Sequence, residues 1–173
     1  SKNFNVNAQC QDFLLLSEAK MYDKVIGNPP YFQMKKADAI DAGYESYLDV
    51  CAGKPNIYAM FIKASINALK VGGELVYVVP TSMNNGNDFR LLREYIIDKT
   101  NIKNIISFND DCFDSAQQNV MILHLEKLAP EVSNDGKYVF TKSGITIFST
   151  DTEFLYNKFE SGYTLEELGF DVM

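Results

Sequence analysis

Between residues 4 and 127, short apolar runs alternate with segments in which apolar residues recur about every third or fourth position. Short apolar runs bounded by polar or turn residues are typical of buried strands, and the longer spacing is typical of amphipathic helices. Strands that alternate with helices in this way predict an α/β fold with a mostly parallel sheet.

The apolar runs predict five strands. We expect buried strands at residues 13–16, 24–27, 74–79 (closed by Pro80), 102–108 and 120–127. The connection between the last two is too short for a helical crossover, which takes about a dozen residues or more. We therefore expect those two strands to be antiparallel neighbours near the end of an otherwise mostly parallel sheet.

Two helices are predicted between the strands. The first has an apolar face formed by Ile57, Met60, Phe61, Ala64 and Ala68, and we expect Gly72-Gly73 to end it. The second follows Asp88, a candidate N-cap, and its apolar face contains Phe89, Leu92, Tyr95 and Ile96.

The pattern changes after Leu128. A loop is expected first, followed by short strand-like pieces at 138–141 and 145–148 and a helix at about 152–159. We therefore divide the chain into an α/β region, residues 1–128, and an extension, residues 129–173, that leads towards a further domain. The start at Ser1 and the ending at Met173 favour a piece cut from a longer chain.

Composition narrows the class of protein. The chain has 173 residues, of which 46% are hydrophobic and 13% aromatic, so it can form a real core and is not intrinsically disordered. No apolar run approaches the roughly 18–20 residues of a membrane span, and no signal segment opens the chain, so we expect a cytoplasmic protein without membrane contact. The net charge of −7 disfavours binding of nucleic acid by this segment alone.

The cysteines and the histidine support none of the common metal-binding or nucleophilic arrangements. Cys10, Cys51 and Cys112 are widely spaced, so neither a disulfide framework nor a cysteine-based zinc site is supported. The single histidine, His124, lies within an apolar strand pattern and is interpreted as a packed residue. Without it no Ser-His-Asp or Cys-His arrangement can form, which argues against nucleophilic hydrolysis.

The most specific chemistry lies in Asn28-Pro29-Pro30-Tyr31, directly after the expected strand at 24–27. Open α/β folds bind ligands at the carboxyl ends of their strands. Asn28 offers an amide acceptor, and the prolines lack N–H groups and hold nearby carbonyls in place. Two converging acceptors suit an amino group, and Tyr31 offers a flat face for a planar base. Taken alone, the tetrapeptide is equally consistent with a purely structural role, in which the prolines end the strand and Tyr31 packs in the core.

An ordered series of segments accompanies this tetrapeptide. Over residues 9–127 the chain resembles the N6-adenine DNA methyltransferases of restriction-modification systems, in which the target-recognition domain follows the catalytic domain. Asn28-Pro29-Pro30-Tyr31 resembles their motif IV. Four further segments resemble motifs III, V, VI and VIII, in that order: residues 10–15, 56–61, 71–80 and 111–114. The strand expected at 120–127 follows the last of them. Residues 163–169 resemble the run into the recognition domain.

The resemblance implies a Rossmann-like fold, S-adenosyl-L-methionine as cofactor and double-stranded DNA as partner. Asn28 and the Pro29 carbonyl are implied to accept both hydrogens of N6 on a flipped adenine, with Tyr31 and Phe113 stacked on the base. Asp12, Phe13 and Asn28 are implied to contribute to the cofactor pocket. Without the motif order, Asp12 is interpreted as a surface carboxylate and Phe13 as a core residue.

The chain also departs from this family. The glycine-containing cofactor loop of these enzymes has no counterpart, because Gly27 is the first glycine in the sequence. We therefore expect this piece to be inactive by itself. We also expect an open sheet edge at residues 25–27 that favours pairing between copies.

Two charged segments are given no catalytic role. The acidic loop at residues 109–112 is a solvated turn, and methyl transfer to an amine needs no metal. Lys35 and Lys36 follow motif IV, and they either are simply exposed to solvent or contact a phosphate.

Two alternatives stay open at this point. One is a methyltransferase that acts on protein glutamine or ribosomal RNA, because Asn-Pro-Pro-Tyr suits side-chain amides as well as exocyclic amines. The other is a non-catalytic α/β interaction module with a decayed motif, which binding of S-adenosylmethionine by the full-length parent would exclude. The insertion at residues 33–55 and the extension after Lys127 favour the DNA enzymes.

Overall fold

The computed structural model describes residues 8–16, 21–84, 86–107, 120–130, 138–142 and 145–149, the last two ranges as backbone only. The helices are η1 (Phe13–Leu15), α1 (Lys36–Asp41), η2 (Glu45–Val50), α2 (Ile57–Ala68), η3 (Thr81–Met83), η4 (Asn87–Phe89) and α3 (Arg90–Lys99), where η marks a 3-10 turn. The strands are β1 (Tyr22–Gly27), β2 (Leu69–Pro80), β3 (Thr100–Ser107), β4 (Val120–Lys127), β5 (Tyr138–Lys142) and β6 (Ile145–Ser149).

The strands form one sheet in the order β1-β2-β4-β3-β5-β6. Strands β1, β2, β3 and β5 run in one direction, whereas β4 and β6 run in the opposite direction. The expected α/β fold is confirmed, and so is the antiparallel pairing of β3 with β4. Strand β4 also pairs with β2, from Glu74–Glu126 to Pro80–Val120, so it lies between two strands that precede it in sequence.

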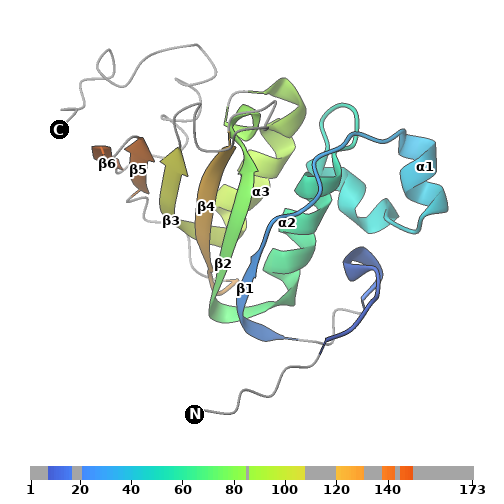
Figure 1. The fold of residues 1–173 in the computed structure, drawn as a ribbon, viewed down its shortest axis with the longest axis horizontal. Coiled ribbons are helices and arrows are strands. Elements are labelled where there is room, and N and C mark those ends of the chain that lie inside the picture. Colours follow the sequence, from blue (N-terminus) through green and yellow to red (C-terminus); the bar gives the residue numbers. More distant parts are fainter. Residues whose placement is uncertain are drawn as a thin grey trace.

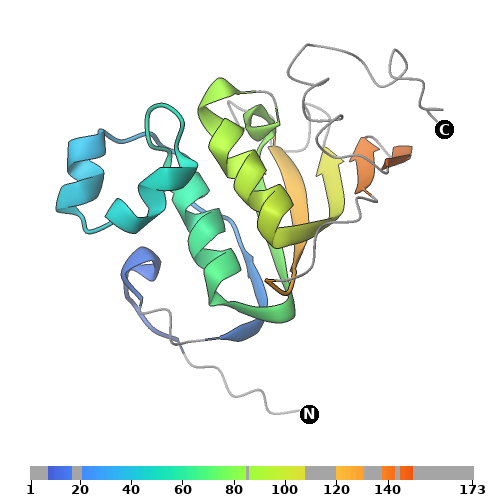
Figure 2. The same cartoon turned by 180° about the vertical axis from the view of Figure 1, so that it is seen from behind.

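Helices α2 and α3 cover the same face of the sheet, as Figures 1 and 2 show from opposite sides. Alternation in β2 turns Leu75, Tyr77 and Val79 into the core beneath these helices. Helix α2 contributes Ile62 and Ile66, and it begins where the Asn56 side chain accepts a hydrogen bond from the Tyr58 N–H at 3.3 Å. No described helix covers the opposite face of the sheet.

Two sequence predictions on the first half of the chain are wrong. Residues 13–16 do not form a strand. Phe13–Leu15 form the 3-10 turn η1, because the Asp12 side chain accepts from the Leu14 N–H at 3.0 Å and caps the turn. Helix α2 ends at Ala68, ahead of Gly72-Gly73, and leads directly into β2.

The predicted N-cap at Asp88 is also wrong. Asp88 belongs to the 3-10 turn η4, and α3 begins at Arg90 after Phe89, whose side chain makes no capping hydrogen bond. Phe89 is buried, so core packing and not capping sets the start of this helix.

The strand predicted at 24–27 is present, but its predicted burial is wrong. Among the described strands, β1 pairs only with β2 and forms one edge of the sheet (Figure 1). The Ile26 side chain on this strand is 83% exposed. Within the described residues, the open edge expected at 25–27 is therefore present. An edge strand with an exposed apolar side chain is a template for pairing with another chain.

The later strands extend the same sheet. Strands β5 and β6 lie where short strands are predicted, and β5 pairs with β3. The helix predicted at 152–159 lies outside the described residues. Within the part of the chain that the structure describes, no helix is both long enough and apolar enough to cross a membrane.

We expect the 173-residue chain to self-associate through β1. Replacing Ile26 by Lys places a charge on the exposed strand and should lower the average molar mass measured by light scattering over a concentration series. The control is Ile40→Lys in α1, where the native side chain is also exposed but lies away from the sheet edge. Equal molar masses for Ile26→Lys and the native chain would contradict pairing at this edge.

Candidate active site

The Asn28-Pro29-Pro30-Tyr31 segment leaves the sheet at the carboxyl end of β1, beside the parallel strand β2. Asn28 is exposed, Pro29 is buried and Tyr31 is half-buried. The strand can approach β2 closely because residue 27 is glycine: a Cβ there would lie 3.2 Å from Cε1 of Tyr77. The predicted location of the segment, at the carboxyl end of a strand in an α/β sheet, is thus confirmed. Open α/β sheets commonly bind their ligands at this edge.

Tyr31 is fixed at both its ring and its hydroxyl. The hydroxyl donates to the Val78 carbonyl at 2.7 Å and also lies within hydrogen-bond distance of Asn28 Oδ1. Its ring meets Tyr58 edge-on, with centroids 6.0 Å apart, and Tyr58 stacks on Phe89 at 5.1 Å. Burial raises the pKa of Tyr31 and of Tyr58, so both hydroxyls keep their protons at neutral pH.

Asp12 and Phe13 lie beside α2. The Asp12 carboxylate is exposed and accepts hydrogen bonds from the Leu14 N–H and the Tyr44 hydroxyl. Phe13 is half-buried, with its ring centroid 5.6 Å from that of Phe61. Among the described residues, no hydrogen bond or ring contact joins these two side chains to the Asn28–Tyr31 segment. Phe113, the second predicted stacking residue, lies outside the described residues.

The remaining candidates add no second reactive centre. His124 is half-buried on β4, with Nδ1 3.1 Å from Asn104 Nδ2 and Nε2 3.7 Å from Glu74 Oε1. Burial raises the pKa of the Cys51 thiol, which keeps it protonated. The described residues contain no cluster of three or more His, Cys, Asp or Glu side chains that is suited to a metal ion. Cys112 and the acidic loop at 109–112 lie outside the described ranges.

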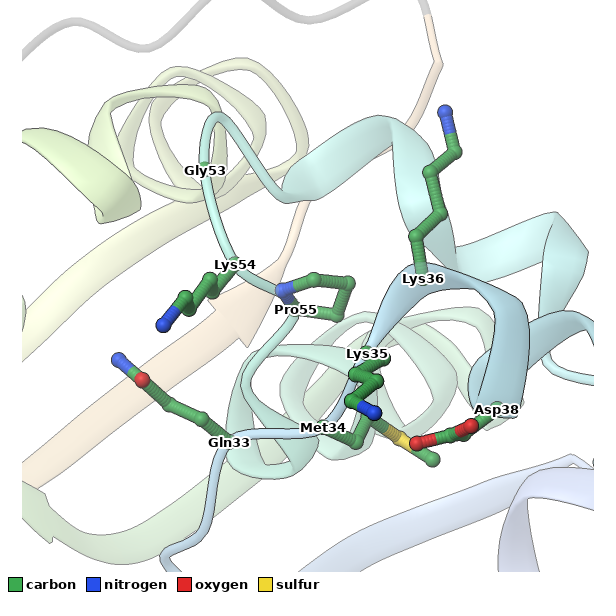
Figure 3. Close-up of a pocket in the computed structure, with 8 residues that line it drawn as sticks. All are labelled: Gln33, Met34, Lys35, Lys36, Asp38, Gly53, Lys54 and Pro55. Carbon is green, nitrogen blue, oxygen red and sulfur yellow. The ribbon is translucent and has the colours of Figure 1, made fainter.

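A basic pocket of about 550 Å³ has Gln33, shortly after the Asn28–Tyr31 segment, among its lining residues. Figure 3 shows the side chains that line it. An antiparallel bridge between Gln33 and Asn56 holds its two walls together, and the Met34 N–H donates to the Pro55 carbonyl at 2.9 Å. Three lysines and one acid are among its lining residues, which are Gln33, Met34, Lys35, Lys36, Asp38, Gly53, Lys54 and Pro55.

The lysines of this pocket differ from most others that the structure describes. Lys35, Lys36 and Lys54 form no ion pair with any described residue, whereas Lys24, Lys63 and Lys70 each form one. Their side chains point in different directions from the two walls, and Lys54 extends alongside Gln33 (Figure 3). This arrangement presents separate positive charges over an open surface.

Arg93 is a residue whose role the sequence analysis missed. It is 3% exposed, and its guanidinium donates to the carbonyls of Met83 and Gly86, both at 2.9 Å. These bonds tie the segment after β2 to α3 beside the ring cluster of Tyr58 and Phe89. A signal was present, because Arg93 falls on the apolar stripe of Phe89, Leu92 and Ile96.

Known structures share this arrangement of strands and helices. A protein of Listeria monocytogenes, proposed to be a class I S-adenosylmethionine-dependent methyltransferase, superposes with a TM-score of 0.61 at 21% identity, over 86% of this chain and 43% of that one. At this identity the likeness concerns the fold. The fold is therefore of the class I methyltransferase type.

Sequence relatives narrow the family. The chain is 29% identical to the Type II methyltransferase M.AccI of Acinetobacter calcoaceticus over an alignment of 127 positions, gaps included, that covers 69% of this chain and 23% of that protein. It is 28% identical to M.BsuBI of Bacillus subtilis over an alignment of 194 positions, gaps included, that covers 94% of this chain and 37% of that protein. The Eco57I restriction-modification methylase family matches residues 1–113, and the chain belongs to this family. It spans between 23% and 37% of the length of these two relatives.

The buried ring cluster predicts how stability depends on pH. Because burial raises the pKa of Tyr58 above the usual tyrosine value of 10.0, its contribution to stability is complete below pH 10 and is lost as the pH rises towards the folded-state pKa. Replacing Tyr58 by Phe should make the alkaline decline in unfolding free energy shallower, by up to about 1.4 kcal/mol per pH unit.

The measurement is urea unfolding between pH 8 and about 11. Tyr22→Phe, at an exposed position on β1, serves as the control and should leave the slope unchanged. Identical slopes for Tyr58→Phe and the native chain would contradict the assigned burial.

Proposed function

We propose that the complete protein that contains this chain transfers a methyl group from S-adenosyl-L-methionine to the N6 amino group of a flipped adenine in double-stranded DNA. One observation carries the proposal: the Asn28-Pro29-Pro30-Tyr31 segment directly follows the carboxyl end of β1, where open α/β sheets bind ligands, in a member of a restriction-modification methylase family. The 173-residue chain alone is proposed to be inactive, since it spans a minor part of its relatives.

Asn28 and Pro29 supply the acceptors that this reaction needs. The exposed Asn28 amide and the Pro29 backbone each offer a carbonyl oxygen, and adenine N6 carries two hydrogens to donate. The N6 lone pair is normally delocalised into the ring. Two acceptors favour a more tetrahedral nitrogen and offset the positive charge that grows on it during transfer. Tyr31 stacks on the flipped base, together with Phe113, and offsets part of the stacking lost from the duplex.

The described residues fit the adenine part of S-adenosyl-L-methionine. Asp12 is exposed, and each of its carboxylate oxygens has a second lone-pair direction to accept from an amino group. The half-buried ring of Phe13 gives an apolar wall beside it. The bound cofactor supplies an activated methyl group on a positively charged sulfur. Asp12, Phe13 and Asn28 are the residues of this chain that hold and orient it.

The direct test is nucleoside analysis of duplex DNA methylated by the complete encoded protein with labelled cofactor. N6-methyladenine is the expected product. In the Asn28→Ala enzyme, turnover should fall about 10²–10³-fold, the typical effect of deleting one polar group that stabilises the transition state. Cofactor affinity, measured by calorimetric titration, should change far less.

Other outcomes reject the proposal. Methylated protein or ribosomal RNA in place of DNA would favour a different methyltransferase, and failure to bind the cofactor at all would favour a non-catalytic module. A wild-type rate in the Asn28→Ala enzyme would falsify the assignment of this residue.

The lysine pocket supports DNA as the substrate. Lys35 and Lys36 follow the Asn28–Tyr31 segment closely in sequence, and Lys54 lies on the wall that the Gln33–Asn56 bridge joins to theirs. None of the three forms an ion pair with a described residue. In a chain of net charge −7, such a local group of cations suits the phosphates that flank a flipped base.

Salt dependence of DNA binding tests this role. Replacing Lys35, Lys36 and Lys54 together by Gln should weaken binding and reduce the slope of log K against log salt by about 0.9 for each phosphate that is no longer neutralised. The matched control replaces Lys24, Lys70 and Lys99, which are exposed and ion-paired elsewhere, and should leave the slope unchanged. Equal slopes for both triple variants would remove the pocket from the DNA interface.

A further inference from the structure

The Tyr31 hydroxyl has more neighbours than hydrogens to give. It lies 2.7 Å from the Val78 carbonyl and within hydrogen-bond distance of Asn28 Oδ1. Both neighbours are acceptors, whereas a phenol carries one hydrogen. If Oδ1 of Asn28 faces the hydroxyl, the single phenol hydrogen can bond to only one of the two oxygens. The other oxygen–oxygen contact then has no hydrogen between its atoms.

The Val78 carbonyl has the stronger claim on that hydrogen. It is a backbone acceptor whose position is fixed by the sheet, one residue beyond the last β1–β2 pair, Gly27–Tyr77. A carbonyl cannot be turned into a donor, and leaving it unpaired beside the buried strand end is costly. The Asn28 carboxamide, in contrast, is exposed and can turn by 180° to exchange its oxygen for its NH₂ group.

We infer that Tyr31 is a positioning residue for Asn28: its hydroxyl donates to Val78 and accepts from Asn28 Nδ2, which turns Asn28 Oδ1 outward as a free acceptor. Each of the two hydrogen bonds, Tyr31 to Val78 and Asn28 to Tyr31, then has a hydrogen of its own. The inference rests on the proposed function, because it assigns the outward oxygen to the substrate amino group.

This arrangement gives Tyr31 a role separate from its ring. Stacking on a base requires an aromatic face, which phenylalanine also has. Orienting an amide requires a hydroxyl whose own hydrogen is committed elsewhere, and the Val78 carbonyl, 47 residues away in sequence, provides that commitment. Without the hydroxyl, the Asn28 amide is free to present either its oxygen or its NH₂ group to the substrate.

The test is a double-mutant cycle in the complete encoded protein. Tyr31→Phe should lower kcat about 2- to 10-fold, the usual net value of one neutral hydrogen bond, and leave KM for DNA within about twofold. In the Asn28→Ala background there is no amide to orient, so adding Tyr31→Phe should cause no further loss. Equal losses in both backgrounds would overturn the inference, because the hydroxyl would then act through Val78 or the ring alone.

Tyr95→Phe is the matched control. Tyr95 is also half-buried and donates to an asparagine, Asn67 Oδ1, at 2.6 Å, but this pair joins α3 to α2 away from the site. Its removal should leave kcat unchanged in both backgrounds. A loss equal to that of Tyr31→Phe would show a general effect on stability and would overturn the inference.

A second readout is independent of activity. With asparagine labelled by ¹⁵N in the complete protein, the side-chain NH₂ signal of Asn28 is identified by its loss in Asn28→Ala. One of its hydrogens should exchange with water about 2- to 10-fold faster in Tyr31→Phe than in the wild type, as expected on losing one hydrogen bond. Unchanged exchange overturns the orientation of the amide even if DNA methylation itself is not observed. Slow exchange in an enzyme that does not methylate adenine rejects the proposed function alone.

Discussion

The parallel pairing of β1 with β2 is the constraint on which the site depends. The register from Lys24–Glu74 to Gly27–Tyr77 decides where the chain leaves the sheet, and hence where Asn28 stands relative to Val78. It is maintained by the close approach of Gly27 to the Tyr77 ring, and the Tyr77 hydroxyl is held in turn by Ser65 Oγ at 2.5 Å. A slip of one residue would reverse the face on which each side chain lies and would separate Tyr31 from its carbonyl partner.

Around this pairing, one set of polar side chains anchors the backbone and another offers charge at the surface. The segment after β2 is anchored by a buried arginine, Arg93, whose guanidinium donates to backbone carbonyls and presents no charge at the surface. The lysines beyond the Asn28–Tyr31 segment instead stay free of described ion pairs. The residue that anchors the backbone, Arg93, is therefore different from the lysines that offer positive charge near the tetrapeptide.

The sequence was sufficient to predict an element where a single hydrophobic periodicity runs through the segment. Helix α2 and strands β3 and β4 lie close to their predicted ranges, because one apolar face or an alternating pattern specifies each of them. Strand β2 contains its predicted range, 74–79, but begins earlier, at Leu69. The sequence was insufficient where a side chain competes with the backbone pattern. The run at 13–16 is apolar enough for a strand, yet the Asp12 carboxylate captures the Leu14 N–H and bends the chain into a turn. At Phe89, burial outweighs the capping preference of Asp88.

The candidate site was likewise predictable from the sequence only in part. Asn28-Pro29-Pro30-Tyr31 was identifiable because four adjacent residues carry its chemistry, and the end of a strand is a predictable location. The link from Tyr31 to Val78 joins residues 47 apart and depends on register, which composition and spacing do not reveal. The roles assigned to Asp12, Phe13 and Phe113 rest on resemblance and stay predictions.

The position of β4 between β2 and β3 has a consequence for synthesis of the chain. Both neighbours of β4 are translated before it, so the sheet has a gap in its centre until residue 127 has left the ribosome. During that interval the inner edges of β2 and β3 present unpaired N–H and C=O groups, and Leu75, Tyr77 and Ile105 lack their neighbours. Because closing the gap requires contacts between distant residues, we expect late, slow closure of the sheet and a nascent chain that benefits from a chaperone.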